Sequence, residues 1–144
     1  MRAPPGSRDA YRAFVPLPTR WHDNDAYGHM NNAVYYALID TAVTLWQMAH
    51  GLQIQGPEAL RLMVVQSGCR YHAETGFPDV IHAGLRLGHL GRTSFTTEVG
   101  LFANDDPTAR AEGFFAQVHV APDNRPSPIP QTLRDALGTI ANAG

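Results

Sequence analysis

A carboxylate, a histidine and two asparagines gather in one short, turn-rich segment, Asp25-Ala26-Tyr27-Gly28-His29-Met30-Asn31-Asn32. A helix is expected to start directly after it, and the free N–H groups of a first helical turn carry the positive end of the helix dipole. They would stabilise an oxyanion developing on an acyl carbonyl. Asp25 could then attack the same carbonyl carbon, or position and deprotonate a water. Both routes end in hydrolysis of a thioester.

Three neighbours of Asp25 suit this chemistry. Gly28 lacks a Cβ, which permits a sharp loop and lets a ligand approach the backbone closely. His29 and the amides of Asn31 and Asn32 are candidate groups for orienting the substrate. Asp23 is expected to support the loop and could pair with Arg20.

The helix that would present these N–H groups is predicted over residues 31–50. Asn31 or Asn32 is a plausible N-cap and Gly51 a C-terminal stop. Asp40 is the only formally charged side chain in it. Apolar residues occupy most of its sides, so we expect it to be buried on most sides. Its helical spacing is carried by Val34, Leu38, Ala42, Leu45 and Ala49.

Strand-like runs surround this helix in the sequence. Pro16 and Pro18 mark residues 14–21 as an edge strand. Four more strands are predicted after the helix, at Leu60–His72, Val80–Leu90, Thr93–Phe102 and Ala109–Val120. Turns at residues 91–92 and 104–107 make neighbouring strands antiparallel.

These elements predict one domain over residues 1–144, of the α+β class. In it a five-stranded antiparallel sheet wraps around one long central helix. Within the third strand after the helix, Phe95, Thr97, Val99 and Leu101 are expected on the drier face. Residues 1–11 are predicted to be a loose arm, and residues 131–140 a short closing helix.

The string D-x-D-A-Y-G-H-M-N-N-A-V-Y-Y resembles the signature of hotdog-fold acyl-CoA thioesterases of the 4-hydroxybenzoyl-CoA thioesterase-like superfamily. L-I-D-T-A, L-G-R-T-S-F and R-P-S-P-I-P-Q-T-L-R also look like that family. The resemblance implies that Asp25 is the catalytic carboxylate and that the backbone N–H of Asn32 polarises the thioester carbonyl. It further implies an acyl-CoA substrate and no metal or other cofactor. Active sites would lie between the subunits of a homodimer, which often pairs into a homotetramer.

A related hotdog branch places its catalytic Asp inside the helix, in a context similar to Leu38-Ile39-Asp40-Thr41-Ala42. Asp40 is therefore a second candidate. Its alternative is a buried carboxylate bonded to backbone or tyrosine, within the chain or across a dimer interface. That branch has a Gly-Gly pair at the helix start, where this chain has Asn31-Asn32. We therefore favour Asp25.

Other residues are candidates for binding the substrate. Arg92, Thr93 and Ser94 follow a turn and could contact the phosphates or pantetheine of CoA, or be solvated hairpin residues. Tyr35 and Tyr36 on the helix are core or interface aromatics, or else substrate contacts. Arg70 and Arg86 are weaker candidates of the same kind as Arg92.

Several other chemistries are disfavoured. The histidines and aspartates of residues 22–29 lack the i,i+4 histidine pair or Cys cluster of common zinc sites. Cys69 is expected to be a small buried hydrophobe. No G-x-S-x-G string occurs. All 11 basic residues are Arg, which removes lysine Schiff-base chemistry.

Composition limits partners and location. A net charge of -2 gives no cationic footprint for nucleic acid or an anionic membrane. A single Cys cannot form an internal disulfide, and no apolar run is long enough to span a bilayer. We therefore expect a cytoplasmic protein.

The sequence thus predicts an acyl-CoA thioesterase, with the acyl group left open. Two alternatives remain: a hotdog hydratase or dehydratase acting on an acyl thioester, and an acyl-CoA binding module without turnover.

Overall fold

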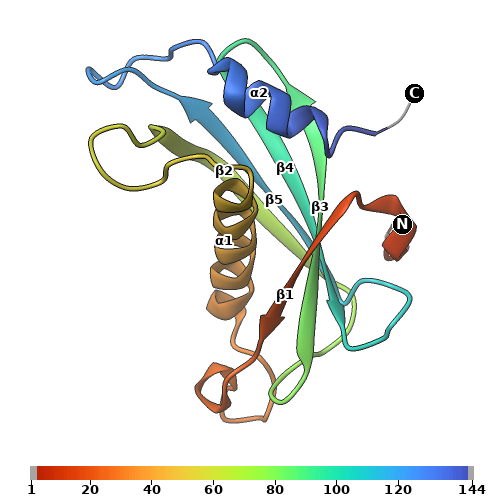
Figure 1. Ribbon diagram of the computed structural model, residues 1–144. Helices are drawn as coiled ribbons and strands as arrows, with labels where there is room; N and C mark the ends of the chain where they lie inside the picture. Colours follow the sequence, from red (N-terminus) through yellow and green to blue (C-terminus); the bar gives the residue numbers. More distant parts are fainter. Residues whose placement is uncertain (1–2, 143–144) are drawn as a thin grey trace.

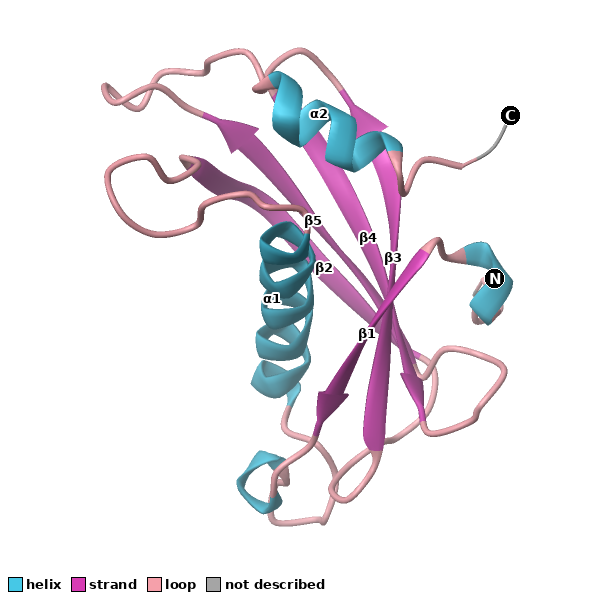
Figure 2. Ribbon diagram, viewed as in Figure 1, coloured by secondary structure: helices cyan, strands magenta, loops and turns pink. Residues whose placement is uncertain are grey.

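The computed structural model describes residues 3–142, and one antiparallel sheet forms its frame (Figures 1 and 2). The strand order across the sheet is β1-β3-β4-β5-β2. All five predicted strands are confirmed close to their expected bounds, including β1 at one edge, where its prolines are tolerated. The strands are β1 (Ala13–Pro18), β2 (Leu62–Tyr71), β3 (Val80–Leu90), β4 (Ser94–Ala103) and β5 (Ala111–His119).

Alternation along β4 separates the two faces of the sheet. Phe95, Thr97, Val99 and Leu101 are buried, as predicted. Their period of two places them on one face. On this face the sheet packs against helix α1, and the two surfaces together form the hydrophobic core.

Helix α1 spans Asn32–Ala49 and agrees with the predicted range. Asn31 is its N-cap and accepts a hydrogen bond from the backbone N–H of Ala33. Gly51, just past the end, has a φ of 77°, a conformation that glycine adopts without strain. Both ends of α1 are therefore determined by local sequence.

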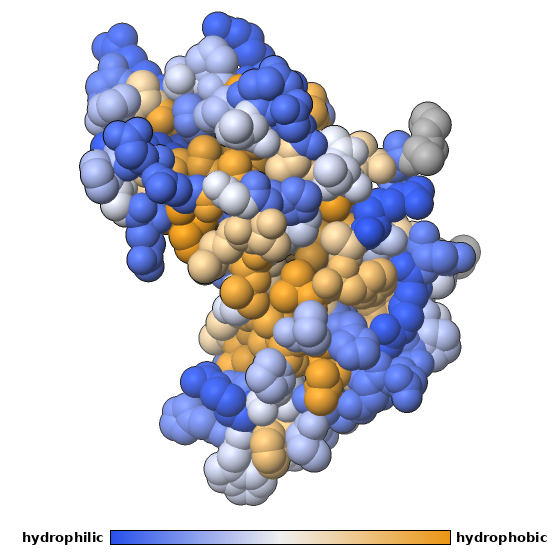
Figure 3. Space-filling model, viewed as in Figure 1, coloured by the Kyte–Doolittle hydropathy of each residue, from blue (hydrophilic) through white to orange (hydrophobic). Residues whose placement is uncertain are grey.

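The sheet of one chain does not enclose α1, which corrects the expectation of a helix buried on most sides. Leu45 and Met48 are 40% and 52% exposed, and Asp40 is exposed as well. Hydrophobic side chains accordingly gather on the face of the molecule where α1 lies (Figure 3). The central helix has 18 residues, and a second helix, α2 (Gln131–Gly138), closes the other end of the sheet. None of the helices in residues 3–142 is long and apolar enough to cross a membrane.

The prediction of a loose arm over residues 1–11 is wrong for residues 3–11. Residues 1–2 lie outside the described part of the chain. Residues Arg8–Ala10 form a short 3-10 helix, and the Arg8 guanidinium donates to the Asp106 carbonyl. Tyr11 is 4% exposed and lies on the sheet face opposite α1. Its side chain covers Gly84 and Gly100, where a Cβ would meet the Tyr11 Cβ at 2.8 Å and the Tyr11 ring at 2.6 Å, respectively. The two glycines thus create the space that holds the segment.

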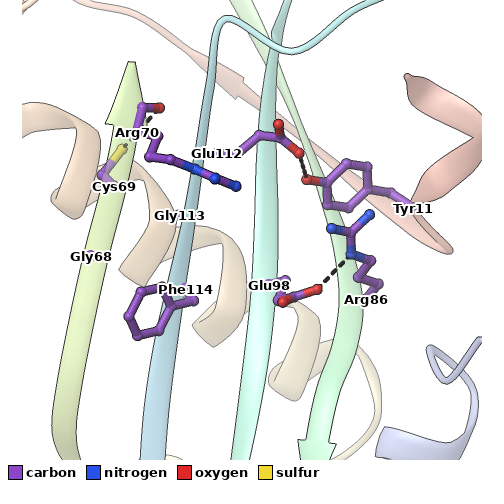
Figure 4. A pocket seen from close by; sticks show the side chains of 9 residues that line it. All are labelled: Tyr11, Gly68, Cys69, Arg70, Arg86, Glu98, Glu112, Gly113 and Phe114. Atoms are coloured by element: carbon purple, nitrogen blue, oxygen red, sulfur yellow. Dashed lines mark hydrogen bonds and ion pairs between the residues drawn. The ribbon is translucent and has the colours of Figure 1, made fainter. Parts of the chain in front are cut away.

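Glu112 fastens the same segment to the sheet (Figure 4). Its carboxylate accepts hydrogen bonds from the Tyr11 hydroxyl and the Gly6 N–H, and lies 3.1 Å from His72 Nε2. Burial acts to raise the pKa of Glu112, but these partners outweigh it, so the pKa lies below its ordinary value of 4.5. Beside it, Arg86 pairs with Glu98 and stacks on Tyr11.

This lowered pKa predicts a pH-dependent contribution to stability. A carboxylate with a depressed folded-state pKa stabilises the protein fully above pH 4.5, and the contribution is lost as the pH falls below that value. We expect Glu112→Gln to cost about 1 to 3 kcal/mol at pH 7. Urea unfolding should show the difference from wild type shrinking below pH 4.5. Glu58 is exposed, and Glu58→Gln should change neither the free energy of unfolding at pH 7 nor its dependence on pH. A difference between Glu112→Gln and wild type that stayed constant with pH would contradict this role of Glu112.

Candidate active site

The Asp25 carboxylate is held by its own loop. Its Oδ1 accepts hydrogen bonds from the backbone N–H groups of Tyr27 at 2.9 Å and His29 at 3.2 Å. The Asp25 N–H in turn donates to the His29 carbonyl at 2.7 Å. Gly28 closes the turn with a φ of 79°, which explains why glycine suits this position. Oδ2 of Asp25 makes no hydrogen bond within the described residues, so it is available for chemistry.

The start of α1 presents one unused backbone donor. The Ala33 N–H is taken by the Asn31 side chain, and the Val34 N–H donates to the Asn31 carbonyl. The N–H of Asn32 has no acceptor among residues 3–142. A first-turn N–H without a partner at the positive end of a helix is a ready donor for an oxyanion.

Asp25 and Asn32 line the same cavity, which has a volume of about 350 Å³. It opens between the loop before α1 and the end of β2. His29 and Tyr35, both predicted as site residues, lie there too. The full lining is Asp25, His29, Met30, Asn32, Tyr35, Tyr71, His72, Ala73 and Glu74.

Residues 74–79 support the Asp25 loop from the other side. The Met30 N–H donates to the Thr75 carbonyl at 2.9 Å, and the Asn24 side chain accepts from the Phe77 N–H at 3.0 Å. Asp23 performs the supporting role expected of it, since its buried carboxylate lies 2.8 Å from the Arg20 guanidinium. The loop therefore has a fixed backbone on both flanks.

Tyr35 and Tyr71 form an aromatic wall of the cavity, with ring centroids 4.9 Å apart in an edge-to-face arrangement. Burial raises the pKa of the Tyr35 hydroxyl. Burial, together with the nearby Cys69 thiol, raises the pKa of Tyr71 to about 12. Both phenols are therefore neutral donors near neutral pH.

Sequence reasoning missed the contribution of the β2 end, namely Tyr71, His72 and Glu74. These residues follow a strand-like run and carry no motif, so no local pattern distinguishes them. The only signal that could have found them is the topology, which places the end of β2 beside the start of α1. Cys69 is half-buried against the core and not fully buried as expected, and burial raises its pKa.

Two sets of predicted residues lie outside this cavity. Arg92, Thr93 and Ser94 sit in the β3–β4 hairpin, at the end of the sheet covered by α2 and opposite the Asp25 loop (Figure 1). Asp40 lies further along α1, and its side chain is exposed in the single chain; a buried carboxylate at a dimer interface stays a prediction. Arg70 and Arg86 line a different pocket, on the sheet face opposite α1 (Figure 4). No group of three or more His, Cys, Asp or Glu side chains within residues 3–142 is arranged to hold a metal ion.

Comparison with known proteins assigns the class. The family model of the thioesterase-like superfamily matches residues 19–137, a span that includes the Asp25 loop, α1 and all strands from β2 to β5. The chain therefore belongs to the thioesterase-like superfamily and is a thioester hydrolase of the hotdog fold. A search of curated proteins found no match.

Solved structures agree with this assignment. The PA5185 protein from Pseudomonas aeruginosa strain PAO1 is 45% identical, with a TM-score of 0.92, over 97% of this chain and 99% of that one. The PA2801 protein of Pseudomonas aeruginosa is 31% identical, with a TM-score of 0.81, over 88% and 98% of the two chains. Slr0204, a 1,4-dihydroxy-2-naphthoyl-CoA thioesterase from Synechocystis, shares the fold at 16% identity, with a TM-score of 0.80 over 87% and 94%.

Proposed function

We propose that this protein hydrolyses an acyl-CoA to the free acid and CoA in the cavity between the Asp25 loop and the end of β2. One observation carries the proposal: the Asp25 carboxylate and the unpartnered N–H of Asn32 line the same cavity. A carbonyl placed there would meet a donor for its developing negative charge and a carboxylate for its carbon. The same arrangement was expected from the sequence.

The proposed reaction begins with the thioester carbonyl oxygen accepting from the Asn32 N–H. Asp25 then either attacks the carbonyl carbon, giving a mixed anhydride that water hydrolyses, or deprotonates the attacking water. In both routes the acyl–sulfur bond breaks and CoA leaves. Gly28 permits the turn of the Asp25 loop, and Asn31 caps the first turn of α1. We propose that His29 and Tyr35 contact the substrate. The proposed chemistry needs no metal or other cofactor. We also propose that the protein is cytoplasmic.

Thiol release tests this function. We expect the wild-type protein to liberate one thiol and one free acid per acyl-CoA consumed, for at least one member of a panel of aromatic and aliphatic acyl-CoAs. An enoyl-CoA in the panel separates hydrolysis from hydration, since a hydratase would give hydroxyacyl-CoA without thiol. Saturable binding with no product from any substrate would instead indicate a binding module.

We also propose that the active protein is a homodimer or a homotetramer of such dimers. β2 is an edge strand, and within residues 3–142 one of its sides is unpaired. Its residues Met63, Val64 and Val65 are 48%, 50% and 61% exposed. Consecutive apolar residues on such an edge are a template for pairing with another chain. The exposed apolar side of α1 would be covered together with it.

Such a dimer would also give the β3–β4 hairpin a role. Two copies of β2 pairing antiparallel bring the Leu62 end of one strand beside the Tyr71 end of the other. In each chain Leu62 pairs with His119, whose N–H donates to Thr93. The hairpin carrying Arg92 and Ser94 of a second copy would therefore approach the catalytic cavity, where it could bind CoA.

Val65→Arg tests this assembly. An arginine at this edge would place a desolvated charge in the interface, so we expect a monomer with at least about tenfold lower activity. Size-exclusion chromatography with light scattering measures the first effect, and thiol release the second. Val80→Arg, at a β3 valine that is 42% exposed, should leave the oligomeric state and the activity unchanged. A wild-type protein that is monomeric and active would contradict the assembly.

A further inference from the structure

We propose that Glu74 is a positioning residue that holds the His29 imidazole at the catalytic cavity; the inference rests on the proposed function. Glu74 Oε2 lies 2.9 Å from His29 Nε2. Both side chains line the cavity that contains Asp25 and the Asn32 N–H. Glu74 thus adds a second carboxylate to the site. It contacts the ring of His29, whereas Asp25 contacts the His29 backbone.

The backbones of the two partners are fixed independently of their ion pair. The Met30 N–H, directly after His29, donates to the carbonyl of Thr75, directly after Glu74. The Arg110 guanidinium donates to the Glu74 carbonyl and is itself paired with Asp106 at 2.5 Å. Removal of the Glu74 carboxylate therefore leaves both segments in place and frees only the imidazole.

The pair contributes little to folding. The His29 and Glu74 side chains are 47% and 73% exposed, and exposed ion pairs are weakly stabilising because solvent screens them. Other charged or titratable groups line the two pockets that His29 borders. Asp25, His72, Tyr35, Tyr71 and Glu74 line the catalytic cavity, and Asp79 lines the adjoining pocket. The pair therefore adds little stability, and the backbones on both sides of it are held by other hydrogen bonds. Its effect on the imidazole is the role that remains.

The geometry gives that effect a specific form. A bond from Nε2 to Glu74 fixes the ring plane and leaves Nδ1 as the remaining polar atom of the imidazole. The His29 backbone also donates to and accepts from Asp25, so the ring and the carboxylate share one rigid turn. With the ring free to rotate, substrate would still bind at Asn32, but the arrangement for reaction would be populated less often.

Steady-state kinetics of thiol release test the proposal on Glu74→Ala, Glu74→Gln, His29→Ala and the double variant. We expect Glu74→Ala to lower kcat about tenfold with KM within about twofold of wild type. Glu74→Gln, whose amide oxygen accepts the same bond, should recover most of kcat. In the His29→Ala background, Glu74→Ala should have no further effect. Exposed Glu58→Ala is the matched control and should behave as wild type.

Two results would overturn the role of Glu74 and leave the proposed function in place. One is a Glu74→Ala protein with the kcat of an active wild type, and the other is full additivity of the Glu74 and His29 substitutions. Thermal unfolding of each variant is the check that the fold is retained. Absence of thiol release by the wild-type protein would overturn the proposed function, and the role of Glu74 with it.

Discussion

Asp25→Asn is expected to lower kcat for thioester hydrolysis by about 10²- to 10⁴-fold. The amide is neither a nucleophile nor a base, so both proposed routes lose their reacting group. Its oxygen can still accept the two bonds that Oδ1 of Asp25 accepts from Tyr27 and His29. The loop should therefore keep its shape, and KM and the unfolding temperature should stay close to those of wild type.

Asp40→Asn is the matched control for this experiment. Asp40 is exposed on α1 and does not line the cavity that contains Asp25, so we expect the kcat of Asp40→Asn to stay within about twofold of wild type. The two variants remove the same charge by the same substitution. Equal turnover by wild type and Asp25→Asn, with a loss in Asp40→Asn, would move the chemistry to the helix.

Gly113→Ala is expected to destabilise the fold, because it adds a methyl group where the packing leaves no room. Gly113 lies in β5 opposite Cys69 of β2, on the face that packs against α1. A Cβ there would lie 2.8 Å from the backbone oxygen of Gly68 and 2.6 Å from Cδ1 of Ile39. The side chain of Ile39 can move, but the strand cannot shift without disturbing its ladder. We expect a loss of about 1 to 3 kcal/mol in the free energy of unfolding.

Gly138→Ala controls for the same change of residue type. A Cβ at Gly138, the last residue of α2, would meet nothing within 4 Å. Alanine is a better helix former than glycine, so this variant should be unchanged or more stable by up to about 1 kcal/mol. Urea unfolding measures both proteins. A Gly113→Ala protein as stable as wild type would show that the β2–β5 contact is looser than the structure has it.

Local signals account for what the sequence predicted well. The cap at Asn31, the stop at Gly51 and the periodicity between them act within a few residues, so α1 could be predicted before any contact was known. The same is true of the alternation in β4. The candidate catalytic segment could also be proposed from the sequence, because Asp25, Gly28 and Asn32 belong to one loop and one helix start; its role stays a prediction.

Long-range packing accounts for what the sequence did not show. Tyr11 is held by glycines of β3 and β4 and by Glu112 of β5, so nothing near residue 11 predicted its burial. Glu74 meets His29 only because the end of β2 is brought back to the start of α1. The exposed side of α1 was unexpected because a helix pattern reports that a face is apolar, but not whether the same chain covers it.

The measurement that tests the central claim most directly is the crystal structure of Asp25→Asn with an acyl-CoA bound. We predict that the thioester carbonyl oxygen lies about 2.7 to 3.1 Å from the Asn32 backbone nitrogen, with its carbon facing residue 25. A thioester bound away from the start of α1, for example in the pocket lined by Arg70 and Arg86, would contradict the assignment of the active site.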